Sequence, residues 1–391
     1  MNTHEKPTGL AASLALTSLA SAGTSVIWNG LPFIAKHQYG FDETATLLLY
    51  LLVGSVYIFG AMCSSRWARA MASTCSPRTI LAVLLMLQAA VCSLPLFFSD
   101  AWVIWVAGGV AGLCSALLWP LVESFLVSGR HGRAMRRAIG WWNIVWMISV
   151  ASTMFAMAPL MENHASMVIV ALGCMNLLAV CVLPFYKSRP ARHDEEIAAC
   201  AVPSGYSNLL KGARLLLPLS YIINGTLAPL LPFVLSNLAV DTFWQTPAVA
   251  TWMIARVVVT ACMWHWPNWH GRWSVLWIAV AMMAIGFVSI FMASGMVLLF
   301  TGLVLFGGGM GIAYYAGLYY AMAVGRAGLN ASGTHEALIG AGYTVGPAVG
   351  MLSIASTQSD LSTSPSALIG TVGCLIVVAM ASLWVIWRKA R

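Results

Sequence analysis

Twelve long apolar runs limit what this chain can fold into more than any other feature of its sequence. Each has roughly the 20 residues that an α-helix needs to cross the apolar core of a bilayer. The expected spans are residues 9–35, 45–67, 79–98, 101–127, 137–161, 166–186, 209–236, 246–264, 274–293, 297–323, 336–357 and 366–387. Since 60% of the 391 residues are hydrophobic and only 8% are charged, the sequence predicts an all-α membrane protein with twelve transmembrane helices.

The positions of the basic residues predict how these helices are oriented. All of the 20 lysines and arginines except Lys36 and Arg256 lie at the termini, at the predicted cytoplasmic ends of spans, or in loops after even-numbered spans. Because cytoplasmic loops are rich in Lys and Arg, we expect both termini in the cytoplasm and a multi-pass protein of the plasma (cytoplasmic or inner) membrane. The orientation of the helices then explains the net charge of +8, and we expect no nucleic acid as a partner. We expect a monomer surrounded by lipid.

Enzyme motifs are absent from the sequence. It contains no phosphate-binding loop, no nucleophile elbow and no cluster of metal ligands. The nine cysteines lie in apolar runs or in loops of cytoplasmic character, so they are expected to be small hydrophobic side chains. We therefore expect no enzyme activity, no cofactor and no bound metal.

Internal similarity divides the chain into two halves. Residues 187–208 are polar and contain two prolines, which predicts a linker between helices 1–186 and helices 209–391. The halves match at an offset of about 200 in three places. Leu31-Pro32-Phe33 matches Leu231-Pro232-Phe233, and Ala138-Ile139-Gly140 matches Leu338-Ile339-Gly340. The third match is between the stretches that begin at Gly112 and at Gly311. Two parallel six-helix repeats are typical of secondary transporters, whose solute site lies between the repeats.

Two loops and one glycine-rich helix are similar to signatures of the major facilitator superfamily. The loop after span 2 reads Ser65-Arg66-Trp67-Ala68-Arg69, and the loop after span 8 reads Asn268-Trp269-His270-Gly271-Arg272; neither has the acid of the family signature. The Gly-Pro pattern of the family's antiporters is matched in span 11 rather than span 5, at Gly342-x-x-x-Gly346-Pro347-x-x-Gly350. The chain resembles this family over essentially its whole length. The resemblance implies two pseudo-symmetric six-helix bundles around a central cavity.

The resemblance also indicates where a solute would bind, because spans 1, 4, 7 and 10 line the cavity in this family. Trp252 shares a face of span 8 with Arg256, and Asn143 and Trp146 of span 5 are possible additions. The candidates for the cavity are Trp28, Asn29, Trp119, Asn224, Trp252, Arg256, Tyr315 and Tyr319. Phenol, indole and carboxamide groups of this kind bind small organic molecules. For each residue taken alone, packing in the helix core is an equally good interpretation.

Glu123 and Arg256 are the two clear ionisable residues within spans, where charges are costly and often functional. Arg256 is close to the middle of span 8, which predicts a water-filled cavity, a carboxylate partner such as Glu123, or an anionic solute. Glu123 is near the cytoplasmic end of span 4, where it could pair with arginines of a gate or carry a proton.

A cytoplasmic gate is predicted from what the signature loops lack. Arg66, Arg69 and Arg272 keep their charge although both loops have lost the acid. Glu336 is expected in the first turn of span 11, after a loop that includes His335, where it could latch onto Arg66 or Arg69 or only cap the helix. His335 would make such a latch sensitive to pH.

The sequence thus predicts a secondary transporter that moves a small organic solute by alternating access, with proton coupling left open. The alternatives are an uncoupled facilitator and a receptor or scaffold that keeps the transporter fold without transport.

Overall fold

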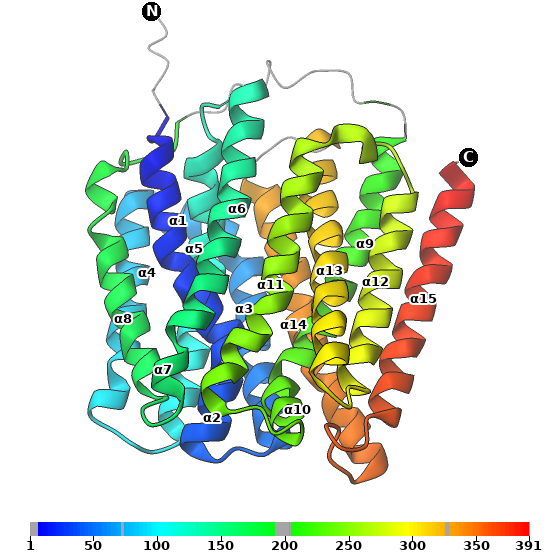
Figure 1. Cartoon of the computed structure of the whole chain (residues 1–391). Helices are drawn as coiled ribbons and strands as arrows, with labels where there is room; N and C mark the ends of the chain where they lie inside the picture. Colours follow the sequence, from blue (N-terminus) through cyan, green and yellow to red (C-terminus); the bar gives the residue numbers. More distant parts are fainter. Residues whose placement is uncertain are drawn as a thin grey trace, which may run out of the picture.

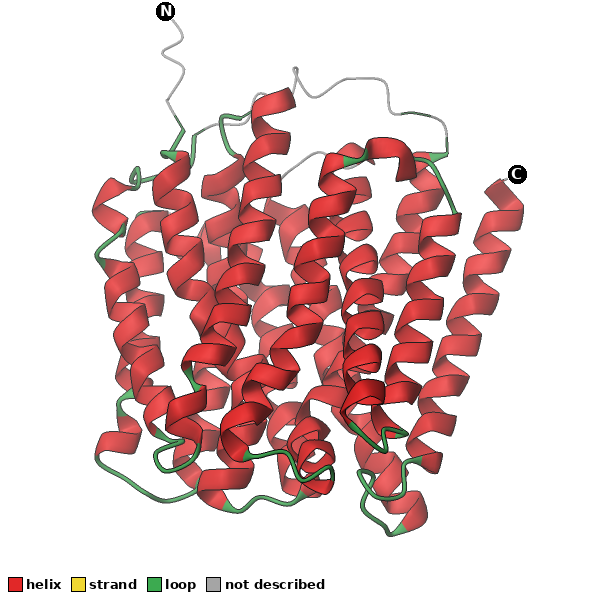
Figure 2. Ribbon diagram, in the orientation of Figure 1, coloured by secondary structure: helices red, strands yellow, loops and turns green. Residues whose placement is uncertain are grey.

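The chain folds into a bundle of long helices that run roughly parallel to one another (Figure 1). The structure is a computed structural model, and it describes residues 7–71, 74–130, 132–191, 203, 205–324 and 329–390. Helices and short loops make up this part of the chain, without a strand among these residues (Figure 2). Twelve helical segments of the described chain are long and apolar enough to cross a membrane, which confirms the predicted number of spans.

Spans 1 to 6 come from the first half of the chain. Their elements are α1 (Leu10–Ser25), η1 (Val26–Gly30), α2 (Leu31–Tyr39), α3 (Glu43–Met71), α4 (Pro77–Cys92), η2 (Leu94–Leu96), α5 (Trp102–Val127), α6 (Gly132–Ala156), α7 (Ala158–Met161), α8 (Met167–Val180) and η3 (Leu183–Phe185). Spans 7 to 12 come from the second half. They are built from α9 (Tyr206–Leu227), η5 (Ala228–Leu230), α10 (Leu231–Asn237), α11 (Thr242–His265), η6 (Pro267–Trp269), α12 (Ser274–Phe291), α13 (Met296–Val324), α14 (Leu329–Thr357) and α15 (Ser366–Ala390). The start of α1 and the end of α15 lie at the same end of the bundle (Figure 1).

Spans 1 and 7 are each interrupted at the same point of the repeat. In span 1 the interruption is the π-helical turn η1, and in span 7 it is the 3₁₀ turn η5. Each is followed by a Leu-Pro-Phe triplet that opens a new α-helix, at Leu31 and at Leu231. Proline fits here because the first turn of a helix has no intrahelical partner for its N–H group. π-Helical turns are frequent at functional sites, and this one presents Trp28 and Asn29.

Two pairs of helices hold the halves together, α3 with α14 and α6 with α11. Both contacts are close because one helix presents glycine to the other. A side chain at Gly340 of α14 would meet the backbone of Ile58 in α3, and one at Gly140 of α6 would fall on the ring of Trp264 in α11. These glycines are the matching residues of the repeat, so the same device joins the halves twice.

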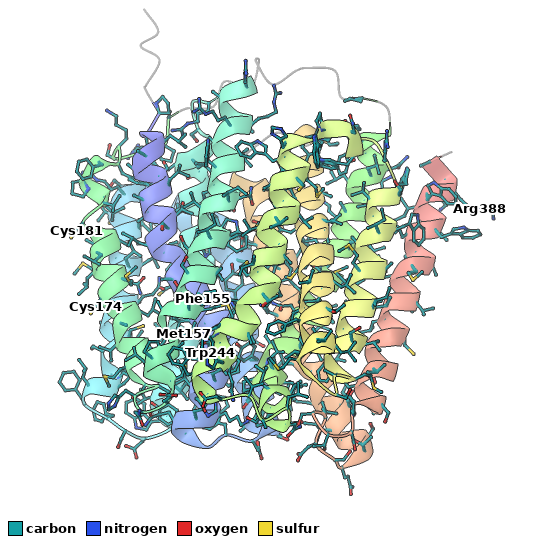
Figure 3. The ribbon with its side chains drawn as sticks, viewed as in Figure 1. Phe155, Met157, Cys174, Cys181, Trp244 and Arg388 are labelled. Carbon is teal, nitrogen blue, oxygen red and sulfur yellow. The ribbon has the colours of Figure 1, made fainter. Side chains whose placement is uncertain are left out.

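The outer surface of the bundle is apolar. Exposed side chains such as Phe155 of α6, Leu177 of α8 and Val297 of α13 point away from the helix core, and Figure 3 shows Phe155 and Cys174 among the outward side chains. Such a surface suits a lipid environment.

Several helix boundaries differ from the prediction, and two of them concern charged residues. Span 1 continues through Lys36, which we expected outside the span, and ends at Gly40, whose φ of 65° gives the left-handed cap that stops the helix. Helix α14 begins at Leu329, so the loop predicted at His335 and the first-turn position predicted for Glu336 are both wrong. The loop expected before span 11 also includes Arg326, which lies outside the described residues.

Candidate solute site

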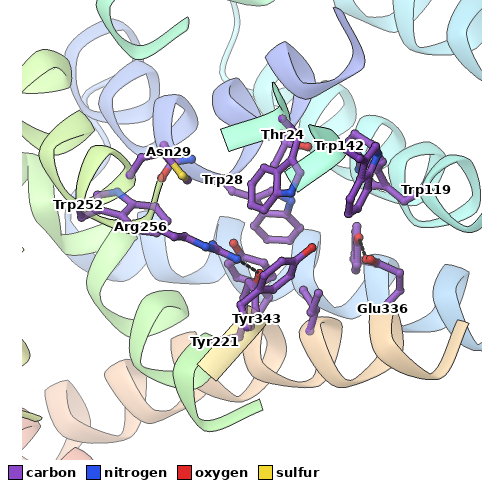
Figure 4. Close-up of a pocket in the computed structure, with 15 residues that line it drawn as sticks. Thr24, Trp28, Asn29, Trp119, Trp142, Tyr221, Trp252, Arg256, Glu336 and Tyr343 are labelled. Carbon is purple, nitrogen blue, oxygen red and sulfur yellow. Dashed lines mark hydrogen bonds between the residues drawn. The ribbon is translucent and has the colours of Figure 1, made fainter. Parts of the chain in front are cut away.

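A cavity lies inside the bundle where the two halves meet (Figure 4). Both halves line it. The first half contributes Thr24, Trp28, Asn29, Tyr57, Trp119, Trp142 and Trp146, and the second half contributes Tyr221, Trp252, Met253, Arg256, Tyr314, Glu336, Ile339 and Tyr343. About 60 Å³ of it is open to water-sized molecules. Because ligand pockets usually measure several hundred Å³, the halves must separate before an organic solute can enter.

Arg256 of α11 is the largest fully buried side chain of the described residues, with 1% of its surface exposed. Gly311 of α13 lets the two helices approach so closely that a Cβ there would lie 3.2 Å from Arg256 Cγ. The guanidinium donates a hydrogen bond of 3.2 Å to the Tyr221 hydroxyl. Its carbon lies 4.4 Å from the centre of the Tyr314 ring and 4.8 Å from that of Trp146. Aromatic rings therefore hold the charge in place.

One donor of Arg256 is left without a partner. The Nε atom is buried and has no hydrogen bond within the described part of the chain. Buried donors are normally satisfied, so an unsatisfied one in a cavity indicates a group that binds there.

Glu336 is the acid of the cavity, and its surface is 6% exposed. The Tyr57 hydroxyl of α3 donates a hydrogen bond to its carboxyl group, which joins the two halves. Figure 4 shows the Arg256 and Glu336 side chains directed into the same cavity, each with a dashed bond to a tyrosine.

The predicted position of Glu336 in a first turn is wrong, because α14 starts at Leu329. Its hydrogen-bonding partner is Tyr57, whereas Arg66 is exposed on α3. The Arg69 side chain lies outside what the structure describes. A latch between Glu336 and either arginine stays a prediction for another conformation.

Trp28 connects the walls of the cavity. Its ring stacks on Tyr343 of α14, with centroids 3.7 Å apart and planes inclined by 10°. The edge of Tyr57 packs against the same indole at 5.4 Å. Asn224 of α9 donates to the Tyr343 hydroxyl at 3.2 Å. Four helical spans thus meet at this stack.

Three more tryptophans of the first half, Trp119, Trp142 and Trp146, line the cavity. Trp119 of α5 and Trp142 of α6 meet edge to face at 6.2 Å. Trp146 donates its N–H group to Asn143 at 3.3 Å, and its ring lies 5.6 Å from that of Tyr314. Indoles arranged in this way give a rigid apolar surface.

The remaining predicted residues lie elsewhere. Asn224, Tyr315 and Tyr319 are outside the set of described residues that line the cavity. Tyr315 packs on Trp269, and Tyr319 stacks on His270 with centroids 4.2 Å apart. The side chain of His335 is buried next to Tyr314, at 5.4 Å between rings.

Glu123 is half-buried on α5, and Arg272 is exposed in the turn before α12. Neither belongs to the cavity lining. The roles predicted for both in gating or coupling stay predictions. Within the described residues, no group of three His, Cys, Asp or Glu side chains could hold a metal ion.

Five aromatic residues of the lining were not among the cavity candidates, namely Tyr57, Trp142, Tyr221, Tyr314 and Tyr343. Most belong to spans 2, 5 and 11, which the family pattern does not assign to the cavity. For two of these residues the sequence contains a pattern that favours a position facing other helices. Tyr343 follows Gly342, and Trp142 precedes Asn143 within a span. Aromatic residues beside small or polar ones in a span often face other helices.

This arrangement defines a membrane transport protein, with a polar and aromatic site enclosed between two pseudo-symmetric halves. The sequence pattern of the Major Facilitator Superfamily matches residues 14–351. The chain belongs to this family, so it is a secondary transporter of a small solute, and family membership indicates a transporter rather than an enzyme.

Solved structures of other transporters have the same fold. The nucleoside transporter NupG covers 97% of this chain and 98% of its own length, with a TM-score of 0.68 and 12% identity. A bacterial homologue of the human lysosomal transporter Spinster, solved in an inward-facing and unoccupied conformation, has a TM-score of 0.72 and 13% identity. The match covers 98% of this chain and 97% of that one. The human organic anion transporter MFSD10 (TETRAN) has a TM-score of 0.62 and 15% identity, and the match covers 96% of this chain and 98% of that one. No curated protein matches the sequence significantly.

Proposed function

We propose that the solute occupies the cavity between the halves and that Glu336 carries a proton that moves with it. The observation behind this proposal is the position of Glu336, a buried carboxyl group of one half hydrogen-bonded to Tyr57 of the other. Separating the halves breaks this bond and exposes the carboxyl group to water. The cost of burying a carboxyl group depends on its charge, so opening and closing are linked to gain and loss of a proton.

Contacts at one end of the bundle support alternating access. At the end away from the termini (Figure 1), Lys36 Nζ of α2 donates to the Pro232 carbonyl oxygen of α10 at 2.8 Å. His37 bonds Gln245 there at 2.9 Å. Glu43 accepts the N–H groups of Leu361 and Ser362 at 2.7 and 3.1 Å. All these bonds cross between the halves, so they must break before the cavity can open at this end.

We further propose the topology and surroundings that the basic residues predict. Both termini face the cytoplasm, the membrane is the cytoplasmic or inner membrane, and the protein acts as a monomer without nucleic acid. Its units are the bundles 1–186 and 209–391, joined by the linker 187–208, most of which lies outside the described residues. The neighbours named as nucleoside and organic anion transporters agree with an organic solute as cargo.

The test is a proton flux measured with the full-length protein in proteoliposomes. Vesicles with a trapped pH-sensitive dye are exposed to fractions of a small-metabolite extract. We expect at least one fraction to change the internal pH with the wild type and not with Glu336→Gln. The matched control is Glu162→Gln, which changes an exposed carboxylate and should keep the flux.

A flux of wild-type size in Glu336→Gln would disprove the coupling. Solute exchange without any pH change would make the protein a facilitator. Absence of exchange with every fraction would favour a receptor or scaffold.

A further inference from the structure

We infer that the solute is an organic anion with a flat aromatic body, whose anionic group binds Arg256 and whose ring lies among the tryptophans. This inference rests on the proposed function only in taking the cavity as the solute site. Its starting point is the unpartnered Nε atom of Arg256.

The guanidinium has donors to spare. Arginine carries five N–H donors in a planar fork, and here one nitrogen, Nη2, donates to Tyr221. Nε lies on the edge of the fork, the edge that binds both oxygens of a carboxylate in bidentate pairs. Hydrogen bonds to a charged acceptor are about twice as strong as those to a neutral one, so this edge selects an anion.

Aromatic neighbours keep the fork in position without using its donors. Tyr314 and Trp146 contact the guanidinium through their π-faces, at 4.4 and 4.8 Å from its carbon. Such contacts stabilise a cation and leave its N–H groups available. The charge is therefore preorganised for a ligand, which lowers the cost of binding.

The rest of the lining fits a flat apolar body. Five indole rings line the cavity, those of Trp28, Trp119, Trp142, Trp146 and Trp252. Trp28 of the first half lies face to face with Tyr343 of the second at 3.7 Å. When the halves separate, these two faces open toward one space, where a flat ring can stack on either of them.

A cationic solute fits the cavity less well. Its partner would be Glu336, and that carboxyl group already accepts a hydrogen bond from Tyr57. A cation would also approach Arg256, the buried charge of like sign.

The experiment compares naphthalene-2-carboxylate with naphthalene-2-carboxamide and 2-aminomethylnaphthalene, three probes with the same ring and different charge. Their binding to the purified full-length protein in nanodiscs is measured by calorimetry. We expect the carboxylate to bind at least about tenfold more tightly than the carboxamide and the amine. A fourth probe, the saturated decahydronaphthalene-2-carboxylate, should bind more weakly than the aromatic anion.

Arg256→Gln should remove the preference for the carboxylate, while Arg256→Lys keeps part of it because the charge remains without the fork. Arg388→Gln is the matched control, since Arg388 also lies over a ring, that of Trp384 at 4.5 Å, but is exposed on α15 (Figure 3). It should bind the probes like the wild type. If the Gln variant does not fold, the wild type and the Lys variant carry the comparison.

Equal binding of carboxylate and carboxamide to the wild type, tighter binding of the amine, or no binding of any probe would each overturn the inference. A preference that persists in Arg256→Gln would do so too. The proposed function fails separately, when metabolite fractions drive no Glu336-dependent proton flux although the anionic probe binds.

Discussion

The two walls of the cavity come from matching halves of a repeat, yet they differ in charge. The wall from the first half is built of tryptophans with a threonine, an asparagine and a tyrosine, whereas the wall from the second half holds both strongly ionisable residues, Arg256 and Glu336. The same backbone plan thus carries an apolar surface on one side and a charged site on the other.

The repeat shows where the difference arose. At the offset of about 200, Arg256 of α11 matches Val56 of α3. Both residues lie near a glycine of the neighbouring helix: a Cβ at Gly311 would lie 3.2 Å from Arg256, and one at Gly112 would lie 3.6 Å from Val56. The position of the charge is therefore not a consequence of the fold. The aromatic rings around Arg256 hold its guanidinium in place, so that it can bind a ligand.

The largest effect is expected from glycines behind the two walls. A methyl group at Gly307 would fall on the carbonyl oxygen of Trp252, whereas one at Gly108 would meet a flexible Leu31 side chain at 3.1 Å. Gly307→Ala should lower the free energy of unfolding by about 3 kcal/mol, since backbone cannot move aside. Gly108→Ala should change it by less than about 1 kcal/mol, because the better helix propensity of alanine offsets the contact. Titration with a denaturing detergent measures both, and equal losses would refute the difference.

Moving the charge to the aligned position of the first half, Val56, which is outside the described cavity lining, tests whether the place of the charge matters. Solute-driven proton flux in the double variant Val56→Arg/Arg256→Val should fall by about a hundredfold, or about 2.7 kcal/mol. The new arginine would stand beside Gly112, where a Cβ would lie 3.6 Å from the Val56 side chain. Val56→Arg alone is the control for folding. Recovery of flux in the double variant beyond that of Arg256→Val would show that the place of the charge is unimportant.

The bond between Tyr57 and Glu336 measures how strongly the walls are joined. A double-mutant cycle with Tyr57→Phe and Glu336→Gln should give a coupling energy of about 1 kcal/mol, the usual net contribution of a hydrogen bond. The readout is the free energy of unfolding. A coupling near zero would mean that the two side chains separate in solution.

The smallest effect is expected at His270, in the turn between spans 8 and 9. Burial lowers the pKa of His270 below its usual 6.5. The unfolded chain then binds the proton first as the pH falls, so stability decreases as the pH drops through about 6.5 and below. The melting temperature should fall by about 1 °C more in the wild type than in His270→Gln between pH 7 and 5. The same pH slope in both proteins would contradict this assignment.

The sequence predicted the architecture better than it predicted the site. Apolar run length and the distribution of charge need only local information, so twelve spans and the repeat followed directly. Trp28, Asn29, Trp252 and Arg256 were located because each follows from depth in a span or from the family pattern. Tyr57 and Tyr343 could not be found in this way, because their position depends on the register between α3 and α14. That register is set by contacts such as Gly340 with Ile58, which join residues far apart in the chain.

Helix α14 illustrates a second limit. Arg326 to Glu336 contains glycine, asparagine and serine, which favour loops, and so we expected the helix to start at Glu336. In the structure the helix begins at Leu329, and the face with Gly333 packs near Ser64 of α3. Packing against a neighbouring helix overrides the local preference.

The bonds of Lys36, His37 and Glu43 across the end away from the termini have a consequence for affinity. They stabilise the conformation in which that entrance is shut, so only a fraction of molecules offers a site to solute arriving from that side. Apparent affinity on that side is reduced by this same fraction, tenfold for each 1.4 kcal/mol or so of closure. Two faces of one membrane can thus see different dissociation constants for a single cavity, set by side chains that never touch the cargo.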